Sequence, residues 1–170
     1  STVPLFIYGQ PFFSLQGLDV TLIAGIYAAV EAISAVMFIV AGYVCSRFSL
    51  GIVAFTTTFI ITLLLLILSM DIGVNASAAS FFLIMSLPAI YETSYETYIH
   101  DNVDSRIRAS CLSAANLVNS VIIGASYTVF GGLVDRYGFS STLVIVAVFC
   151  LIGLLGVITT LRLGAQKSRQ

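Results

Sequence analysis

Charged residues are scarce in this chain, and their scarcity excludes most soluble folds. Only 9% of the 170 residues are Asp, Glu, Lys or Arg, whereas 59% are hydrophobic. An average soluble domain carries about 25% charged residues, and a fold of this size has too much surface to cover with so few of them. Lipid as the solvent is the simplest explanation, and the mean hydropathy of +1.06 agrees with it.

Histidine and paired cysteines are also lacking, which argues against metal chemistry. His100 is the single histidine. The three cysteines, Cys45, Cys111 and Cys150, fall at or inside apolar runs, and no Cys-x-x-Cys pair exists. We therefore interpret the cysteines as small core residues and expect no metal site and no other cofactor. The net charge of −1 gives no indication of a nucleic-acid partner.

What the chain has instead is a series of apolar runs that are long enough to cross a membrane. A span needs about 20 residues, and five runs meet this requirement. They cover residues 20–44, 50–70, 78–100, 109–134 and 139–161. A further run at 1–13 is too short, and we interpret it as the outer half of a helix whose beginning is absent. The chain is therefore expected to be a fragment.

These runs predict an all-α integral membrane protein with five full transmembrane helices and a truncated one. The helical bundle is expected over residues 1–164, with a tail at 165–170. We expect the carboxylate of Asp19 to cap the first full span, because it can accept free amides of the first turn. Pro88 is expected to kink the third span.

The basic residues divide unequally between the two sets of loops. One set holds Arg47, Arg106, Arg108, Arg162, Lys167 and Arg169, whereas the other holds only Arg136. Cytoplasmic loops carry an excess of Lys and Arg. We therefore expect the loops at 45–49 and 101–108 and the C-terminus to face the cytoplasm. The turn at 135–138 is expected to face outside, in a multi-pass protein of the cell (plasma or inner) membrane.

Three motifs resemble those of a known family. Residues 108–113, Arg-Ala-Ser-Cys-Leu-Ser, are similar to the Arg-Ala-Thr-x-Leu-Ser that opens the eleventh helix in many bacterial members of the major facilitator superfamily. Residues 131–138 resemble the Gly-x-x-x-Asp-Arg-x-Gly that ends this helix, and 42–49 resemble the loop motif between helices eight and nine. In the last motif Ser46 replaces the usual Asp and Ser49 the usual Gly, although Arg47 is present.

The resemblance covers essentially the whole chain, as the end of helix seven through helix twelve. It implies most of a six-helix half-bundle, whose partners would be the lipid bilayer and a separate N-terminal six-helix half. The two halves would rock about a midplane site and carry a small solute by alternating access, together with protons. The candidate gating or loop residues are Gly42, Arg47, Glu96, Arg106, Arg108, Gly131, Asp135, Arg136 and Gly138.

Glu31 is the only charged residue in the first full span and lies near its middle. A charge at this depth costs about 2.5–3.5 kcal/mol, so the side chain should face a bundle interior or a water-filled cavity. Tyr27 and Ser34 share its helix face. Two interpretations stay open. Glu31 either couples protons or contacts the substrate, or it is a protonated glutamate hydrogen-bonded to a neighbouring helix.

Glu92 and Glu96 lie four residues apart on one helix face, with His100 one turn further on. At about 1.5 Å per residue, Glu92 lies deepest in the membrane. We interpret Glu92 as a candidate cavity residue. Glu96 is a candidate cytoplasmic gate or a partner of Arg106 or Arg108.

Tyr91, Tyr95 and Tyr98 form a second stripe on the same helix. These rings could stack on a substrate, as aromatic faces do with cations. They could equally be interfacial aromatics that anchor the helix at the membrane surface.

The fourth span repeats a small or polar residue every four positions. These residues are Asn116, Ser120, Gly124, Thr128 and Gly132. Small residues let helix backbones approach closely, so helix packing is the default interpretation. Asn116 is the main exception, because an amide at this depth could line a cavity.

The sequence therefore predicts part of a secondary active transporter, a proton-coupled carrier or an exporter of cationic drugs, since it has acids in the membrane without buried bases. The alternative is a non-transporting receptor or assembly subunit on the same fold. A membrane enzyme would need a constellation such as paired histidines or an Asp-rich metal motif, and the chain has neither. We therefore expect no enzymatic activity.

Overall fold

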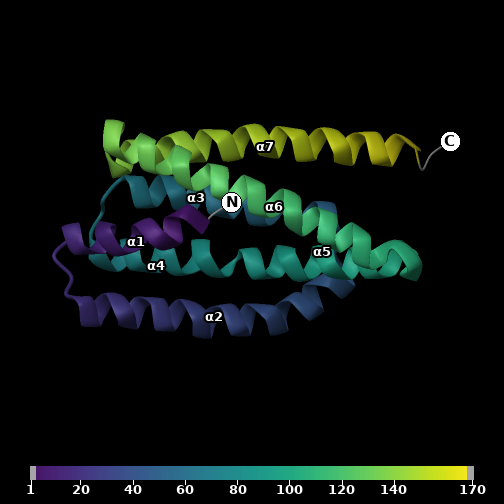
Figure 1. Cartoon of the computed structure of the whole chain (residues 1–170), viewed down its shortest axis with the longest axis horizontal. Coiled ribbons are helices and arrows are strands. Elements are labelled where there is room, and N and C mark those ends of the chain that lie inside the picture. Colours follow the sequence, from purple (N-terminus) through teal and green to yellow (C-terminus); the bar gives the residue numbers. More distant parts are fainter. Residues whose placement is uncertain (1–2, 168–170) are drawn as a thin grey trace.

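The computed structural model of the chain describes the backbone of residues 3–167 and the side chains of residues 3–156, 158 and 159. This described part forms seven helices and no strand (Figure 1). The helices are α1 (Val3–Leu15), α2 (Val20–Arg47), α3 (Leu50–Ser69), α4 (Val74–Ser86), α5 (Pro88–Asn102), α6 (Ser105–Tyr137) and α7 (Phe139–Lys167). The prediction of an all-α fold is confirmed for these residues.

Five segments of the described chain are long and apolar enough to cross a membrane. They are α2, α3, the consecutive pair α4 and α5, α6, and α7. At about 1.5 Å per residue, the 20 residues of α3 span about 30 Å, the thickness of a bilayer's hydrocarbon core. The 13 residues of α1 are too few to cross it. The prediction of a multi-pass membrane protein with five full spans is confirmed at this level.

Asp19 and Pro88 shape the helices as expected. The Leu22 amide donates a hydrogen bond to Asp19 Oδ1 at 2.8 Å, so Asp19 caps α2. Only Leu87 separates α4 from α5. The reason is that Pro88 has no amide hydrogen and its ring crowds the carbonyl four residues earlier. The third span is therefore interrupted where the sequence predicted a kink.

The loops are shorter than predicted. Helix α2 continues to Arg47, so the loop expected at 45–49 shrinks to 48–49. The loop expected at 101–108 shrinks to 103–104, and Gly138 alone separates α6 from α7. Apolar runs mark only the part of a helix that lipid can solvate, whereas helical hydrogen bonds continue into the polar residues beyond. Helix α7 likewise runs past 161 to Lys167, and residues 168–170 of the predicted tail lie outside the described part.

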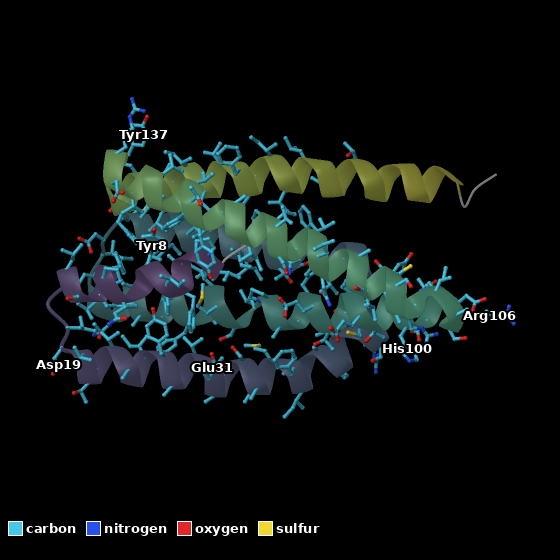
Figure 2. All side chains as sticks on the ribbon, viewed as in Figure 1. Tyr8, Asp19, Glu31, His100, Arg106 and Tyr137 are labelled. Atoms are coloured by element: carbon cyan, nitrogen blue, oxygen red, sulfur yellow. The ribbon has the colours of Figure 1, made fainter. Side chains whose placement is uncertain are left out.

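The helices lie roughly along one axis and alternate in direction, with α4 and α5 in line as one span (Figure 1). Helix α3 packs along α7, α2 packs along α4 and α5, and α1 contacts α2, α4 and α6. Figure 2 shows Asp19 and Tyr137 at one end of the bundle and His100 and Arg106 at the other. We name these the Asp19 end and the His100 end.

A group of aromatic rings fixes the short helix α1 in the half of the bundle near the Asp19 end. Phe12 stacks on Phe139 of α7 with ring centroids 4.5 Å apart, and Phe13 meets Phe81 of α4 edge-on at 5.3 Å. Phe13 and Phe81 are both fully buried. Such pairs contribute about 0.5–1.5 kcal/mol beyond area burial. Close packing of these rings therefore holds α1 in the bundle, although α1 is too short to span the membrane.

A polar link closes the Asp19 end. The Gln16 side chain, in the turn after α1, donates from Nε2 to Asp71 Oδ1 at 2.8 Å and to Ser77 Oγ at 3.3 Å. Asp71 lies in the turn between α3 and α4 and has a φ of +49°. The link therefore joins the α1–α2 turn to the α3–α4 turn.

The surroundings of Gly9 show how closely α1 packs against its neighbouring helices. A Cβ at Gly9 would lie 2.6 Å from a Phe81 ring atom and 2.8 Å from the Tyr27 hydroxyl, whereas a Cβ at Gly25 meets nothing within 4 Å. We expect Gly9→Ala to have a free energy of unfolding about 1–3 kcal/mol below that of Gly25→Ala, because overpacking forces neighbours apart. Both substitutions gain the same helix propensity, so the comparison isolates packing. The measurement is SDS titration in mixed micelles. Equal stability of the two variants would contradict this packing.

Candidate functional site

A hollow opens near the middle of the bundle, between α1, α2, α4 and α5, beside Glu31 (Figure 2). Its volume is about 210 Å³. Three of the lining side chains are polar: Glu31 and Ser34 of α2, and Glu92 of α5. The others are Val3, Phe6, Val30, Phe38, Met85, Pro88 and Ala89. We call it the acidic hollow, because carboxylates from two different helices line it.

Both acids of this hollow lie deep in their membrane spans. Glu31 follows the start of α2 at Val20 by eleven residues, or about 17 Å along the helix. Glu92 precedes the end of α5 at Asn102 by ten residues, or about 15 Å. A hydrocarbon core is about 30 Å thick. Both carboxylates therefore fall inside the core of a bilayer that is centred on these spans.

Helix geometry explains why these side chains meet. Glu31 and Ser34 are three residues apart and so share a face of α2. Glu92 follows the interruption at Pro88 by one turn, on the part of α5 that packs along α2. The neighbouring hydroxyls of α5 are used within their own helix, since Thr93 donates to the Ala89 carbonyl at 2.8 Å and Ser94 to the Ile90 carbonyl at 2.7 Å. Neither hydroxyl donates to a carboxylate of the hollow.

No cation of the described part neutralises these acids. Neither Glu31 nor Glu92 has a hydrogen-bond or ion-pair partner among the described residues. The described arginines all lie near helix ends. Arg47 lies over the Tyr43 ring at 5.5 Å, Arg106 and Arg108 begin α6, and Arg136 lies over the Tyr137 ring at 5.5 Å. The acidic hollow therefore needs protons or a cation from elsewhere to be neutral.

A second hollow, of about 420 Å³, lies between α1 and α2. Phe6, Ile7, Gln10, Val20, Ile23, Ala24 and Tyr27 line it. We call it the Tyr27 hollow. Tyr27 was expected to share the helix face of Glu31. It lies one turn nearer the Asp19 end on this face and lines the adjacent hollow. Ser34, by contrast, lines the same hollow as Glu31.

Phe6 lines both hollows. Its ring meets the Tyr27 ring edge-on, with centroids 4.8 Å apart and planes at 81°. The Tyr27 hydroxyl also donates a hydrogen bond to the Phe6 carbonyl. Phe6 and Gln10 carry no sequence signal of a site, because both stand in a short apolar run and their position depends on how α1 packs against α2.

Glu96 and the tyrosines of α5 lie outside both hollows. Tyr91 and Tyr95 stack on each other, with centroids 6.2 Å apart and planes at 24°. Glu96 is exposed and has no ion pair among the described residues. The alternative in which Glu96 pairs with Arg106 or Arg108 is therefore wrong for this structure. Helix α6 begins at Ser105, so the two arginines belong to α6, whereas Glu96 belongs to α5.

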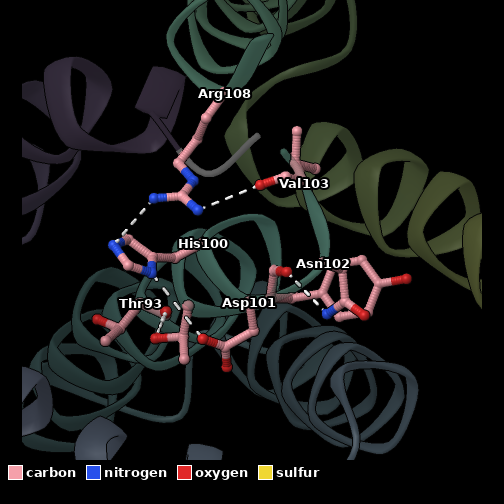
Figure 3. Close-up of polar contacts among 8 residues, drawn as sticks. Thr93, His100, Asp101, Asn102, Val103 and Arg108 are labelled. Carbon is pink, nitrogen blue, oxygen red and sulfur yellow. Dashed lines mark hydrogen bonds and ion pairs between the residues drawn. The ribbon is translucent and has the colours of Figure 1, made fainter. Parts of the chain in front are cut away.

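Arg108 instead clamps the linker between α5 and α6 (Figure 3). Its Nη1 is 3.3 Å from His100 Nε2, and its Nη2 donates to the Val103 carbonyl at 3.2 Å. Since an arginine can only donate, His100 Nε2 is the acceptor. His100 Nδ1 then faces Asp101 Oδ1, 3.9 Å away. The two-residue linker is thus held by a cation at the carboxyl end of α5, where the helix dipole favours positive charge.

The described residues contain no cluster that could hold a metal. No group of three or more His, Cys, Asp or Glu side chains comes together anywhere in the described part of the chain. His100, Asp101 and Asp104 lie close in sequence, but Asp104 is used to cap α6 by accepting the Arg106 amide at 2.9 Å.

Helix α6 leaves one long face uncovered. Its only buried side chain is Phe130. Asn116 is exposed and lines neither hollow, and a Cβ at Gly124 or Gly132 would meet nothing within 4 Å. Helix packing on this small-residue face, the default interpretation, is therefore not found within the described chain. Gly131 on another face is covered, by the Tyr8 hydroxyl of α1.

In the loop motif at 42–49, Cys45 Sγ lies 3.1 Å from Ser94 Oγ of α5, whereas the other described contacts of the motif are local. Ser46 donates to the Tyr43 carbonyl at 2.8 Å, and Gly42 is in open space. Asp135 has no ion pair among the described residues. Gly138 has a φ of +79°, a conformation that glycine adopts without strain, and its amide donates to the Val134 carbonyl to end α6.

The chain was also compared with known proteins. No protein-family model matches it, and no curated protein matches it.

The Arg108 clamp makes a prediction about the α5–α6 linker. We expect Arg108→Ala to speed hydrogen–deuterium exchange of the amides of residues 100–105 about fivefold. This corresponds to about 1 kcal/mol, which is the value of a hydrogen bond to a charged group after allowance for partial exposure. Arg106→Ala is the control, because it removes the same charge from the same linker without a side-chain contact. Equal exchange in the two variants would show that charge alone, not the clamp, matters.

Proposed function

We propose that this chain is most of one half of a secondary active transporter that carries a small solute across the membrane in exchange for, or together with, protons. The observation that carries the proposal is the acidic hollow. Two carboxylates from separate spans line one apolar-walled space at mid-depth, and no described cation pairs with them. Ionisable groups inside a membrane commonly mark ion or substrate pathways.

The chemistry of this hollow suits coupling. An unpaired carboxylate in a membrane is costly, so a proton or a cation has to balance the acids of the hollow. A cationic solute that enters can replace the proton, and release of the solute lets the proton return. Glu31 and Glu92 are therefore assigned the exchange of a proton for the solute, and Ser34 is assigned a hydrogen bond to it.

The open face of α6 supports a second half as partner. Polar amides such as Asn116 are costly against lipid, and they are tolerated where protein or water covers them. Helix α2 is also largely uncovered, with only Ile23, Val30 and Ala41 buried. A six-helix partner placed against α2 and α6 would cover both faces and enclose the acidic hollow at the interface.

Membership of the major facilitator superfamily is part of the proposal. The motif at 108–113 falls in the first turns of α6 and the motif at 131–138 falls at its end, as the resemblance requires. With Arg47, Arg106 and Arg108 at the His100 end, we place that end and the C-terminus in the cytoplasm and the Asp19 end outside the cell membrane.

The test is flux in proteoliposomes that contain the intact protein. A panel of cations, drugs, sugars and organic acids is offered with and without an imposed pH gradient. We expect gradient-driven flux of at least one cationic compound. Glu31→Gln and Glu92→Gln should each reduce it about tenfold or more, because a charge-assisted contact contributes about 1.5–3 kcal/mol.

Asp101→Asn is the matched control, since it neutralises an exposed acid at the His100 end, and it should leave flux within about twofold of the starting protein. Flux of only neutral or anionic solutes would remove the cation pairing. Absence of any gradient-driven flux in folded protein would favour a receptor or assembly subunit instead.

A further inference from the structure

One face of α2 lines both hollows in succession. Val20, Ile23, Ala24 and Tyr27 line the Tyr27 hollow, and Val30, Glu31, Ser34 and Phe38 line the acidic hollow. These positions recur every three or four residues, which is the spacing of a single helix face. From Val20 to Phe38 the stripe is about 27 Å long. The two hollows therefore follow one another from the Asp19 end to beyond mid-depth.

The Phe6/Tyr27 pair stands where the hollows meet. Among the described residues Phe6 alone lines both, and Tyr27 is the last α2 residue of the first hollow. Tyr27 is held from two sides, by its hydrogen bond to the Phe6 carbonyl and by an edge contact with the buried Phe81 at 5.6 Å. The Phe6 ring is 37% exposed and its ring contact is with Tyr27. Phe6 can therefore turn aside without breaking the backbone contact that positions Tyr27.

The charges along this face all have one sign. The lining residues of the two hollows include two acids, Glu31 and Glu92, and no Lys, Arg or His. An anion moving along this face of α2 would be repelled by the carboxylates and would find no group of opposite charge among the apolar lining residues. A cation would be attracted, first by the faces of aromatic rings and then by the carboxylates.

We propose that the two hollows are successive chambers of one cation-selective path, and that the Phe6 ring is the barrier between them. A small organic cation enters from the Asp19 end, waits in the Tyr27 hollow, and passes to Glu31 and Glu92 when Phe6 turns away from Tyr27. The assignment of this cation as the solute rests on the proposed function. The path and its barrier can be measured without transport.

The experiment uses Ser34→Cys as a reporter beyond the barrier, in the intact protein with Cys45, Cys111 and Cys150 changed to Ala. Two membrane-impermeant methanethiosulfonates of similar size, one with a trimethylammonium group and one with a sulfonate, are added to one side of proteoliposomes. Rates are normalised to each reagent's rate with a free thiol. With the reagents added on the side of the Asp19 end, we expect the cationic reagent to modify residue 34 about tenfold faster. Glu31→Gln combined with Glu92→Gln should abolish the preference.

Two variants of Phe6 test the barrier in opposite directions. Phe6→Ala should raise both rates about tenfold, and Phe6→Trp should lower both, because ring size sets the opening. A variant that merely disturbs folding would not produce this pair of opposite shifts. Phe59→Ala, which removes a comparably exposed ring of α3 outside the path, should change neither rate.

Each contrary result has one meaning. Equal rates for the two reagents would overturn the charge selection, and rates that ignore residue 6 would overturn the barrier. No modification of residue 34 from the side of the Asp19 end would overturn the path itself. Gradient-driven flux in that last case would leave the proposed function standing without this route. The predicted labelling without flux would sustain the path and reject the transporter.

Discussion

A carboxylate inside lipid has to be protonated, paired or wetted, and the arrangement of this bundle follows from that requirement. The described arginines stay near helix ends, where water and lipid head groups solvate them. Glu31 and Glu92 do not, and helices α2 and α5 bring both exposed side chains to the lining of one hollow. Any counter-charge must come from outside the described residues, because these supply none to either acid.

The position of α1 matters as much as the acids. This helix is short, and the Pro11 ring interrupts its hydrogen bonds. Burial in lipid gives little drive for helices to associate, so close packing has to hold α1 in place. Phe12 and Phe13 provide it by stacking against α4 and α7. As a result Phe6 is placed against α2, at the point where one hollow gives way to the next.

Much of the fold could be predicted because membrane spans depend on local composition. The apolar runs located five spans, and single residues such as Asp19 and Pro88 set a cap and an interruption by local backbone chemistry. The loop lengths were overestimated, because hydropathy does not register the polar turns with which a helix continues beyond lipid. The candidate site could be predicted less well from the sequence. Glu31 and Glu92 are 61 positions apart, and they line the same hollow because of which faces of α2 and α5 pack together. Arg108 contacts His100 and not Glu96 because the linker between α5 and α6 has only two residues.

The brevity of the connections restricts how this bundle can change shape. The links outside the helices cover residues 16–19, 48–49, 70–73, 103–104 and the single Gly138. A single residue joins α6 to α7, and α7 packs extensively on α3. A tilt of any one of these three helices would therefore move the other two. Helical hydrogen bonding is weakened instead at Pro11 within α1 and at Leu87 between α4 and α5. Pro88 lines the acidic hollow, so the third span is weakened beside the two carboxylates, within a frame whose connections leave little freedom.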